Sequence, residues 1–436
     1  MTRPQMPNAY IPGTTPLPPE DEARIRRRAT LLGPAYRLFY EEPLHITRGD
    51  GVWLYDRDGR AYLDTYNNVA SVGHCHPRVV AAMAQQAATL ATHTRYLHDG
   101  ILDYAERLLA LFPPELSHVM FTCTGSEAND LAFRIARAAT GGTGIIVTDN
   151  AYHGVTLVTA EASLSLGPAI APGPTVFAIP APSAANYPEG IAGGFATAVT
   201  TACAQMAAQG IKPAALVFDT IFSSDGVLPD PPGFLKPAAM AIRATGGLVI
   251  ADEVQPGFGR TGQHMWGFQR HGVIPDMVSL GKPMGNGYPT AGLVLKPQVI
   301  AEFGTNARYF NTFGGNAVAA AVGLAVLDVI RDEGLMENAA TVGTAFAEGL
   351  RNLATHHDAM GETRAAGLFL GTDIVNNGQP DATRAARIVN DLRQNGILIS
   401  ATGPRGHTLK IRPPLPFSLE NIDQFLTTLD RVVARL

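Results

Sequence analysis

Short apolar runs that alternate with alanine-rich stretches fill the middle of the chain, from about residue 78 to residue 330. Runs of this length, bounded by turn-forming residues, are typical of strands that are buried on both faces of a sheet. The stretches between them have the apolar spacing of helices. This alternation predicts an α/β fold with a mainly parallel sheet wrapped by helices. The expected strands are HVMFTC, GIIVTD, ALVFDT, GLVIAD, MVSLG and AGLVLK.

The segments that flank this region have a different pattern. Before it, Gly51 to Asp64 alternates apolar and polar positions around Asp58-Gly59, which predicts a β-hairpin. After Gly334, helices expected over about 336–355 and 381–395 flank short strands at LFLGTDIV and TLKIRP. This second pattern predicts a smaller α+β domain.

The start of the chain has neither pattern. Residues 1–20 hold six prolines and almost no apolar periodicity, which predicts an extended arm. We therefore expect an N-terminal arm over residues 1–30 and a large domain over residues 78–330. The small domain is expected to combine residues 31–77 with residues 331–436.

Composition and charge narrow the classes of partner. The chain has 436 residues, of which 46% are hydrophobic and 16% charged, which suits a globular enzyme with a large core. Its formal net charge is −5, and Arg24 to Arg28 is the one dense basic run. No nucleic acid is expected as a partner, because there is no basic surplus to neutralise phosphate backbones.

Apolar stretches and cysteines bear on where the protein works. The longest apolar stretch, Ala317 to Leu327, is far shorter than a membrane span, and no signal peptide is visible, so no membrane partner is expected. Cys75, Cys123 and Cys203 are too few for a disulfide framework, which predicts a reducing, cytoplasmic location. Cys75 lies in GHCHP, but no second Cys/His pair at zinc spacing accompanies it. We interpret that segment as a turn, with no metal site.

Asp252 and Lys282 form the most informative pair of polar residues. Each stands where an expected strand ends, since Asp252 follows GLVIA and Lys282 follows MVSLG. Ligands of open α/β sheets bind at such carboxyl ends. Pyridoxal phosphate (PLP) needs both residue types, because its aldehyde is held on a lysine amine and its pyridine nitrogen is kept protonated by a carboxylate. Either residue alone is more often the start of a loop, but the pair predicts this cofactor.

The segment FTCTGSEAND follows a strand and opens a helix, which predicts an anion site. Free backbone N–H groups at the helix start, the close approach that Gly125 permits, and the hydroxyls of Thr124 and Ser126 suit a phosphate. A role of Thr124 or Ser126 as helix N-cap is compatible with this site. Tyr152, after GIIVTD, offers an aromatic face for a pyridine ring. Nucleotide motifs fail, because GKPMGNG is not a P-loop and GNGYPT does not complete GxGxxG.

From about residue 30 to residue 436, the chain resembles the class III aminotransferases of PLP fold type I. The motifs TGSEAND, AYHG, ADEVQPGFGRTG, LGKPMGNG and NTFGGN occur in the order and approximate spacing of that family. The resemblance implies Lys282 as the Schiff-base lysine and Asp252 as the partner of the pyridine nitrogen. It further implies Val254 under the ring, Tyr152 above it, Gly125 and Ser126 at the phosphate, Gln255 near the ring hydroxyl, and Thr312 at the phosphate of a neighbouring subunit. A homodimer with shared active sites is therefore expected.

Three further segments resemble one subgroup, which holds alanine–glyoxylate aminotransferase and the phosphoethanolamine and phosphohydroxylysine phospholyases. These segments are YNNVASVGHCHP, TRYLHDGILDYAERL and ISATGP…LKIRPPLPFS. The chain departs from the family at Asp219, where glutamate is usual, and at Ala317, where proline is usual. In addition, TAEASLSLG replaces the phospholyase-like segment. Because the subgroup contains both transfer and elimination enzymes, these departures bear on the substrate.

Substrate contacts are expected from two further segments. Lys410 and Arg412 alternate with apolar residues, so both point to one face of a strand. The resemblance implies that Arg412 grips the acidic group of the substrate, which a guanidinium does bidentately. We interpret Lys410 as part of a solvated basic face. Tyr66 is also expected beside the substrate, and Arg95 is a second candidate for the acidic group.

We expect an aminotransferase that moves an amino group from a primary amine or amino acid to an oxo acid such as pyruvate or glyoxylate. Lys282 would remove and return the proton at the reacting carbon. Asp219 and the apolar VTAEASLSLG segment favour this reaction, because both are expected to open room for a carboxylate acceptor or a bulkier amine. The alternative is a phospholyase that eliminates phosphate from a phosphorylated amino alcohol such as O-phosphoethanolamine. A scaffold without turnover is disfavoured, because it would not need both Lys282 and Asp252.

Overall fold

A seven-stranded sheet forms the centre of the fold in a computed structural model that describes residue 6 and residues 8–436. The strands from β9 to β6 run parallel, and β10 is antiparallel to both of its neighbours. All six expected strands are present, and the prediction of a mainly parallel sheet is confirmed. In spatial order the strands are β4 (His118–Thr122), β10 (Ala291–Leu295), β9 (Met277–Leu280), β8 (Leu248–Asp252), β7 (Pro213–Asp219), β5 (Gly144–Thr148) and β6 (Val176–Ile179).

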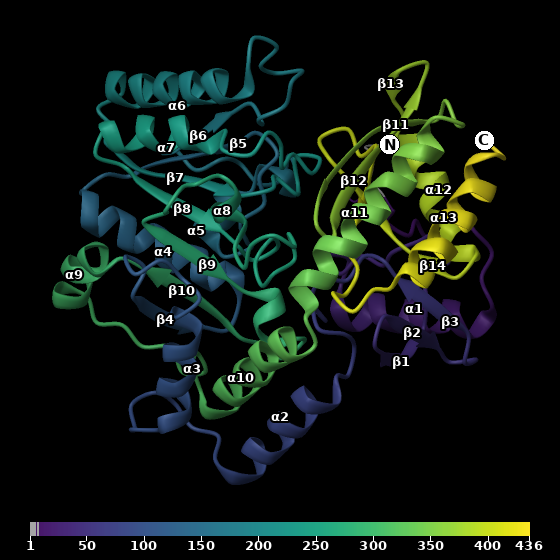
Figure 1. The fold of residues 1–436 in the computed structure, drawn as a ribbon, viewed down its shortest axis with the longest axis horizontal. Coiled ribbons are helices and arrows are strands. Elements are labelled where there is room, and N and C mark those ends of the chain that lie inside the picture. The colour runs from purple at the N-terminus through teal and green to yellow at the C-terminus, as the bar shows by residue number, and fades with distance from the viewer. Residues whose placement is uncertain (1–5, 7) are drawn as a thin grey trace.

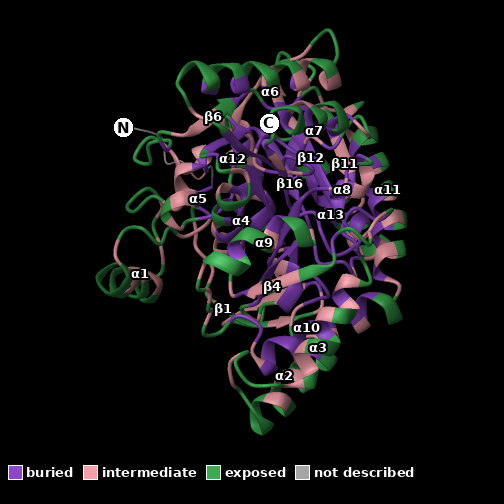
Figure 2. Cartoon of the chain, turned by 90° about the vertical axis from the view of Figure 1, so that its left-hand side faces the viewer, coloured by how far each residue is buried: buried purple, intermediate pink, exposed green. Residues whose placement is uncertain are grey.

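Helices cover both faces of this sheet (Figure 1). Successive side chains of a strand point to opposite faces, so Ile145 and Val147 join one apolar core while Ile146 joins the other. The first core includes α4 (Gly125–Thr140), α9 (Pro297–Asn306) and residues beside α5 (Leu157–Glu161). The second core includes α2 (Pro77–Thr89), α3 (Asp99–Leu109), α6 (Ile191–Ala208), α7 (Leu235–Ala244), α8 (Gly267–Arg270) and α10 (Ala317–Asp332). Figure 2 shows the buried interior between these exposed helices.

Helix α6 is long and apolar enough to cross a membrane by length and composition alone, which the sequence pattern did not lead us to expect. Its alanine, glycine and threonine residues account for this composition. A stripe of buried side chains that includes Phe195, Val199 and Met206 packs into the core that also holds α7. Of the residues of α6, 28% are buried, so α6 is a surface helix that packs one stripe of side chains against the domain.

Two smaller sheets combine the beginning and the end of the chain. The first runs β1 (Ile46–Asp50), β2 (Trp53–Asp56), β3 (Ala61–Asp64) and β14 (Ile397–Leu398), and β14 lies parallel to β3. The predicted hairpin is confirmed in β2 and β3, which pair on either side of Asp58-Gly59. The second sheet runs β11 (Met360–Ala366), β12 (Phe369–Asn376), β16 (Thr408–Ile411) and β15 (Ser400–Thr402), with β13 (Gln379–Pro380) paired to β12. Helices α11 (Leu335–Ala354), α12 (Ala382–Gln394) and α13 (Leu419–Val433) pack beside these sheets.

The expected extended arm over residues 1–30 is wrong in its second half, where α1 (Pro19–Leu32) forms a helix. Pro19 stands at the first helical position, and Glu20, Asp21 and Glu22 fill the first turn, where carboxylates stabilise the helix dipole. Arg24 pairs with Glu20 and Asp21 along the surface. None of the residues of α1 is buried, and the helix lies apart from the interior (Figure 2). Residues 1–5 and 7 of the expected arm lie outside the described residues.

Candidate active site

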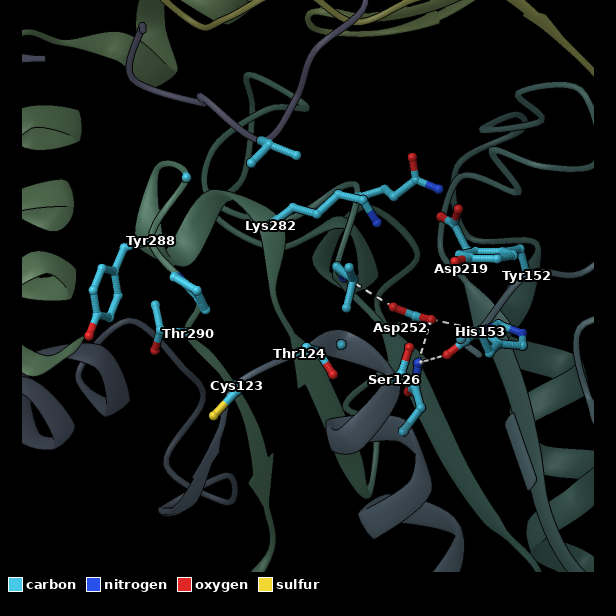
Figure 3. A pocket seen from close by; sticks show the side chains of 18 residues that line it. Cys123, Thr124, Ser126, Tyr152, His153, Asp219, Asp252, Lys282, Tyr288 and Thr290 are labelled. Atoms are coloured by element: carbon cyan, nitrogen blue, oxygen red, sulfur yellow. Dashed lines mark hydrogen bonds and ion pairs between the residues drawn. The ribbon is translucent and has the colours of Figure 1, made fainter. Parts of the chain in front are cut away.

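A cavity of about 320 Å³ opens at the carboxyl ends of the parallel strands, as the positions of Asp252 and Lys282 predicted (Figure 3). It lies beside the ends of β7 and β8, the turn that follows β9, and the start of α4. Most of the residues that the sequence singled out for cofactor and catalysis line it together. These residues are Gly125, Ser126, Tyr152, Asp252, Val254, Gln255 and Lys282.

Asp252 is held in one orientation by three hydrogen bonds. Its Oδ2 atom accepts from Asn129 Nδ2 at 2.8 Å and lies 2.8 Å from His153 Nδ1, and its Oδ1 atom accepts from the Val254 N–H at 3.1 Å. The Asn129 amide also donates to the His153 carbonyl at 2.8 Å, so the two neighbours of the carboxylate are tied to each other. Since Asp252 is only 5% exposed, this network fixes a carboxylate at the floor of the cavity.

Lys282 begins a 3₁₀ turn, Lys282–Gly285, directly after β9 and points into the cavity (Figure 3). Burial lowers the pKa of Lys282 to about 8, and the positive charge of Arg412 acts in the same direction. The carboxylates of Asp252 and Asp219 oppose this shift. An amine with such a pKa is partly neutral near pH 7, so it can take a proton from a substrate.

The start of α4, where the sequence predicts an anion site, leaves two backbone N–H groups open at the cavity. Thr124 is the N-cap, and it forms a capping box with Glu127, whose carboxylate accepts the N–H groups of Cys123 and Thr124. No hydrogen bond of the Gly125 or Ser126 N–H is found among the described residues, so both remain open to a ligand. An N-cap and two open N–H groups are therefore combined in one helix start, which suits the predicted anion site.

Val254 lies against two glycines at the floor of the cavity. A Cβ atom at Gly125 would stand 2.8 Å from a Val254 methyl group, and one at Gly281 would stand 3.1 Å from the other. A side chain at Gly125 would therefore collide with Val254 or displace it. Tyr152 lines the cavity with 37% of its surface exposed, and burial raises the pKa of its phenol, with Asp252 adding to the effect.

Arg412 and Tyr66 lie next to the cavity and are connected to it through Gln255. The Arg412 guanidinium donates to the side-chain oxygens of Gln255 and Asn68, and the Arg412–Asn68 distance is 3.1 Å. The ring of Tyr66 covers the guanidinium carbon at 4.3 Å from the ring centroid. Within the described residues, Arg412 forms no ion pair with a carboxylate, although it is only 7% exposed. Its charge is thus available to an anionic substrate group.

The expectation that Lys410 belongs to a solvated basic face is wrong. Lys410 is 7% exposed, because β16 lies between β12 and β15 and its side chain shares the inward face with Arg412. Its ammonium group lies 5.7 Å from the centroid of the Phe369 ring, and it forms no ion pair among the residues that the structure describes. Burial, with Arg412 beside it, lowers the pKa of Lys410 well below its ordinary value.

Two of the remaining candidates lie outside the cavity of this chain. Thr312 is exposed and does not line it, so its expected contact with a neighbouring subunit stays a prediction. Arg95 is exposed and stacks on Phe310, with its guanidinium carbon 3.8 Å from the ring centroid. This placement does not bring Arg95 to the other predicted substrate contacts.

The site also contains polar residues to which the sequence reasoning gave no role. Asn129 is one of them, although an amide in the apolar stripe of the helix that follows TGSE was a visible signal. His153 and Asn68 each stand inside a quoted motif, but sequence alone does not reveal that they bind Asp252 and Arg412. Their roles depend on contacts between segments that are far apart along the chain.

Comparisons with known proteins agree on a family. A family model described as aminotransferase class III matches residues 39–433. A Drosophila melanogaster protein named alanine–glyoxylate aminotransferase 2-like is 39% identical over 419 residues, which cover 92% of this chain and 85% of that protein. A Caenorhabditis elegans protein named ethanolamine-phosphate phospho-lyase homolog 1 is 36% identical over 436 residues, which cover 94% and 93%. A solved phospholyase from Arthrobacter in complex with phosphoethanolamine is 42% identical, with a TM-score of 0.92 and coverage of 95% of this chain and 100% of that one.

Proposed function

The chain belongs to the class III aminotransferase family and is a PLP-dependent enzyme, and we propose that it eliminates phosphate from a small primary amine that carries a phosphate ester. O-Phosphoethanolamine is the simplest substrate of this class. With water, its elimination yields an aldehyde, ammonia and inorganic phosphate.

The residues of the cavity fit the cofactor. PLP has three groups that need a protein partner. The cavity offers Lys282 for the aldehyde, Asp252 for the ring nitrogen, and the open N–H groups of Gly125 and Ser126 for the phosphate. When bound, PLP supplies an aldehyde that joins the substrate amine and a protonated ring that draws electrons from the adjacent carbon. Asn129 and His153 keep the carboxylate oriented for the ring nitrogen, which is the role expected of groups that support a reacting residue.

The observation that carries the proposal is the pair of buried basic residues formed by Lys410 on β16 and Arg412 directly after it. A phosphate ester carries about −1.5 to −2 charges at neutral pH, whereas a carboxylate carries a single charge. Two basic side chains that form no ion pair with a carboxylate of the described residues suit the more highly charged group, because an unpaired charge is unfavourable in a buried site. The Arthrobacter relative, a phospholyase seen with phosphoethanolamine, supports the same choice.

In this reaction Lys282 acts as the base. Its amine, with a pKa near 8, takes the proton from the carbon that bears the substrate nitrogen. Arg412 and Lys410 hold the phosphate oxygens and stabilise the charge that develops when the neighbouring carbon–oxygen bond breaks. The C–O bonding electrons leave with the phosphate, so the departing group is bound most tightly as it forms.

Transamination, which we expected from the sequence, remains the second candidate. The 39% identical relative named alanine–glyoxylate aminotransferase 2-like favours it. That expectation depended on two departures from the family, the VTAEASLSLG segment and Asp219. In this structure both form hydrogen bonds within the protein. Ser163 Oγ accepts the N–H groups of His153 and Gly154, and the Asp219 carboxylate accepts those of Ile221 and Ser223. These contacts shape the loops around the site and supply no group for an oxo-acid carboxylate.

The two reactions are separated by offering substrates to the cofactor-loaded enzyme. O-Phosphoethanolamine without an acceptor should release phosphate and aldehyde in equal amounts over many turnovers. Alanine should not convert the bound cofactor to its amine form and should not turn over with glyoxylate or pyruvate. Turnover of alanine with glyoxylate, without phosphate release from O-phosphoethanolamine, would establish transamination instead.

We also propose that the enzyme is a homodimer whose subunits complete each other's sites. Exposed aromatic side chains lie near Thr312. The His93 ring stacks on the exposed Tyr96 and contacts the exposed Phe310, two residues before Thr312. Leu97, next in the chain, is 100% exposed, and Phe313 is 70% exposed. Exposed apolar patches of this kind mark interfaces. Sedimentation of the cofactor-loaded enzyme should give the mass of a dimer, and an active monomer would refute this proposal.

A further inference from the structure

Asn286 stands at the end of the turn that carries Lys282. The turn runs Lys282–Gly285, and Asn286 follows it with φ of 46° and ψ of 41°, a left-handed conformation that asparagine adopts more readily than most residues. The chain then continues through Gly287 to Thr290 along the wall of the cavity. The conformation at Asn286 therefore sets the direction in which this wall leaves the lysine.

The side chain of Asn286 binds a second segment of the site. Its Oδ1 atom accepts the Val72 N–H at 3.0 Å, and its Nδ2 atom donates to the Gly73 carbonyl at 2.8 Å. Among the described residues, these two hydrogen bonds are the only ones between segment 64–74 and segment 281–290. The side-chain amide of Asn286 thus connects the turn Lys282–Gly285 to segment 64–74. We call segment 64–74 the acid-group loop.

The acid-group loop is a closed and buried unit. Asp64 Oδ1 accepts the N–H groups of Tyr66 and Asn67 at 3.0 and 2.9 Å. Asp64 Oδ2 lies 2.8 Å from His74 Nε2, so the two ends of the loop are joined. Backbone hydrogen bonds attach the loop to the β16 side of the site, because the Thr65 carbonyl accepts the Arg412 N–H at 2.8 Å.

This loop presents its side chains to the substrate region. Tyr66 covers the Arg412 guanidinium, Asn68 accepts a hydrogen bond from it, and Val69 lines the cavity. The loop therefore belongs with the cations that would hold the acidic group, whereas Lys282 belongs with the large sheet. A reaction that uses both groups on one substrate requires a fixed distance between them.

We propose that Asn286 is a positioning residue that fixes the acid-group loop relative to Lys282. Without its two hydrogen bonds, the loop stays attached to β16 and Lys282 stays attached to β9, but the two are free to shift against each other. The acidic group of the substrate and the carbon that loses its proton would then no longer be presented together. This inference rests on the proposed function only in its choice of a phosphate as the acidic group.

The substitution Asn286→Gly tests this role, because glycine keeps the left-handed backbone without strain and removes both hydrogen bonds. Asn377→Gly is a matched control, since Asn377 also has a positive φ, of 49°, but lies exposed in the turn between β12 and β13. Hydrogen exchange of the peptide that covers residues 64–74 should become faster in Asn286→Gly and remain unchanged in Asn377→Gly. This measurement does not depend on which reaction the enzyme performs.

Kinetics supply the second measurement. For O-phosphoethanolamine we expect kcat/KM to fall about tenfold in Asn286→Gly, the scale of one or two lost hydrogen bonds. The rate at which ethylamine, which has no acidic group, changes the absorbance of the bound cofactor should stay within about twofold. If the wild-type enzyme releases no phosphate, alanine replaces O-phosphoethanolamine, so failure of the proposed function leaves this test intact. Equal losses for the acidic and the non-acidic amine, or unchanged exchange of the loop, would overturn the role of Asn286.

Discussion

Replacing Lys410 by methionine should make the enzyme more stable and less active. Methionine has nearly the same length and flexibility but carries no charge, so Lys410→Met removes a buried cation without leaving a large cavity. In the free enzyme the Lys410 amine has no carboxylate partner among the described residues, and burial lowers its pKa because the charged form is unfavourable there. When a phosphate ester is bound, the same cation contributes to affinity.

Both effects have an expected size. A hydrogen bond to a charged group contributes about 1.5–3 kcal/mol, so kcat/KM for O-phosphoethanolamine should fall roughly 10- to 150-fold. Replacement of a buried charge by an apolar side chain stabilises by about 1–4 kcal/mol. With an unfolding entropy of about 2.1 cal/mol/K per residue, the 436 residues give roughly 0.9 kcal/mol/K. The melting temperature should therefore rise by about 1–4 °C.

The assay combines phosphate release with thermal unfolding of the cofactor-loaded enzyme. Lys236→Met is the control, because Lys236 is exposed on α7 and away from the cavity, and it should change neither quantity. Ethylamine, which lacks the acidic group, should change the cofactor absorbance as fast in Lys410→Met as in the wild type. A variant that keeps full phosphate release, or that loses activity equally with ethylamine, would refute the reasoning that Lys410 binds the phosphate ester.

Three further predictions concern the cofactor site. Asp252→Asn should still bind PLP but lose about a hundredfold or more in kcat, because an amide cannot keep the ring nitrogen protonated; near wild-type turnover would contradict this role. Below pH 8, kcat should fall about tenfold per pH unit, because the substrate frees the Lys282 amine from the cofactor and that amine then takes up a proton. Arg412→Gln should move this fall in kcat to higher pH, because the charge that lowers the Lys282 pKa is gone. A fall that stays at the same pH in Arg412→Gln would show that it does not report Lys282. Gly125→Ala should weaken cofactor binding, because the added methyl group would stand 2.8 Å from a methyl group of Val254. A titration with PLP that gives unchanged affinity would show that the Val254 side chain moves aside.

The sequence predicted the parts of the site that local patterns determine. Asp252 and Lys282 were found because each ends an apolar run, and parallel strands bring such ends to one edge of the sheet. Lys410 was misinterpreted because alternation shows which side chains share a face, but not whether that face is covered. The hydrogen bonds of Asn129 and Asn286 join segments more than a hundred residues apart, and a single sequence carries no sign of such pairings.

The helix α1 was also missed, although its signals are local. Six prolines among residues 1–20 indicated an extended chain, but a helix begins at Pro19, where proline is tolerated and acidic residues follow. Counting prolines over a window hid the place where the composition changes. The position of each proline relative to the charges that follow it was the more informative signal.

The pairing of β3 with β14 has a consequence for how the protein is made. Asp64 ends β3, and its partner Leu398 is synthesised 334 residues later. The N-terminal hairpin is therefore made long before β14, the strand that pairs with β3. At about 5–20 residues per second, that interval lasts roughly 17–67 seconds. The seven-stranded sheet, complete by Leu295, can form meanwhile, while one edge of β3 stays open to other strands. A nascent-chain chaperone that shields this edge would therefore raise the yield of folded enzyme more than one that acts after release.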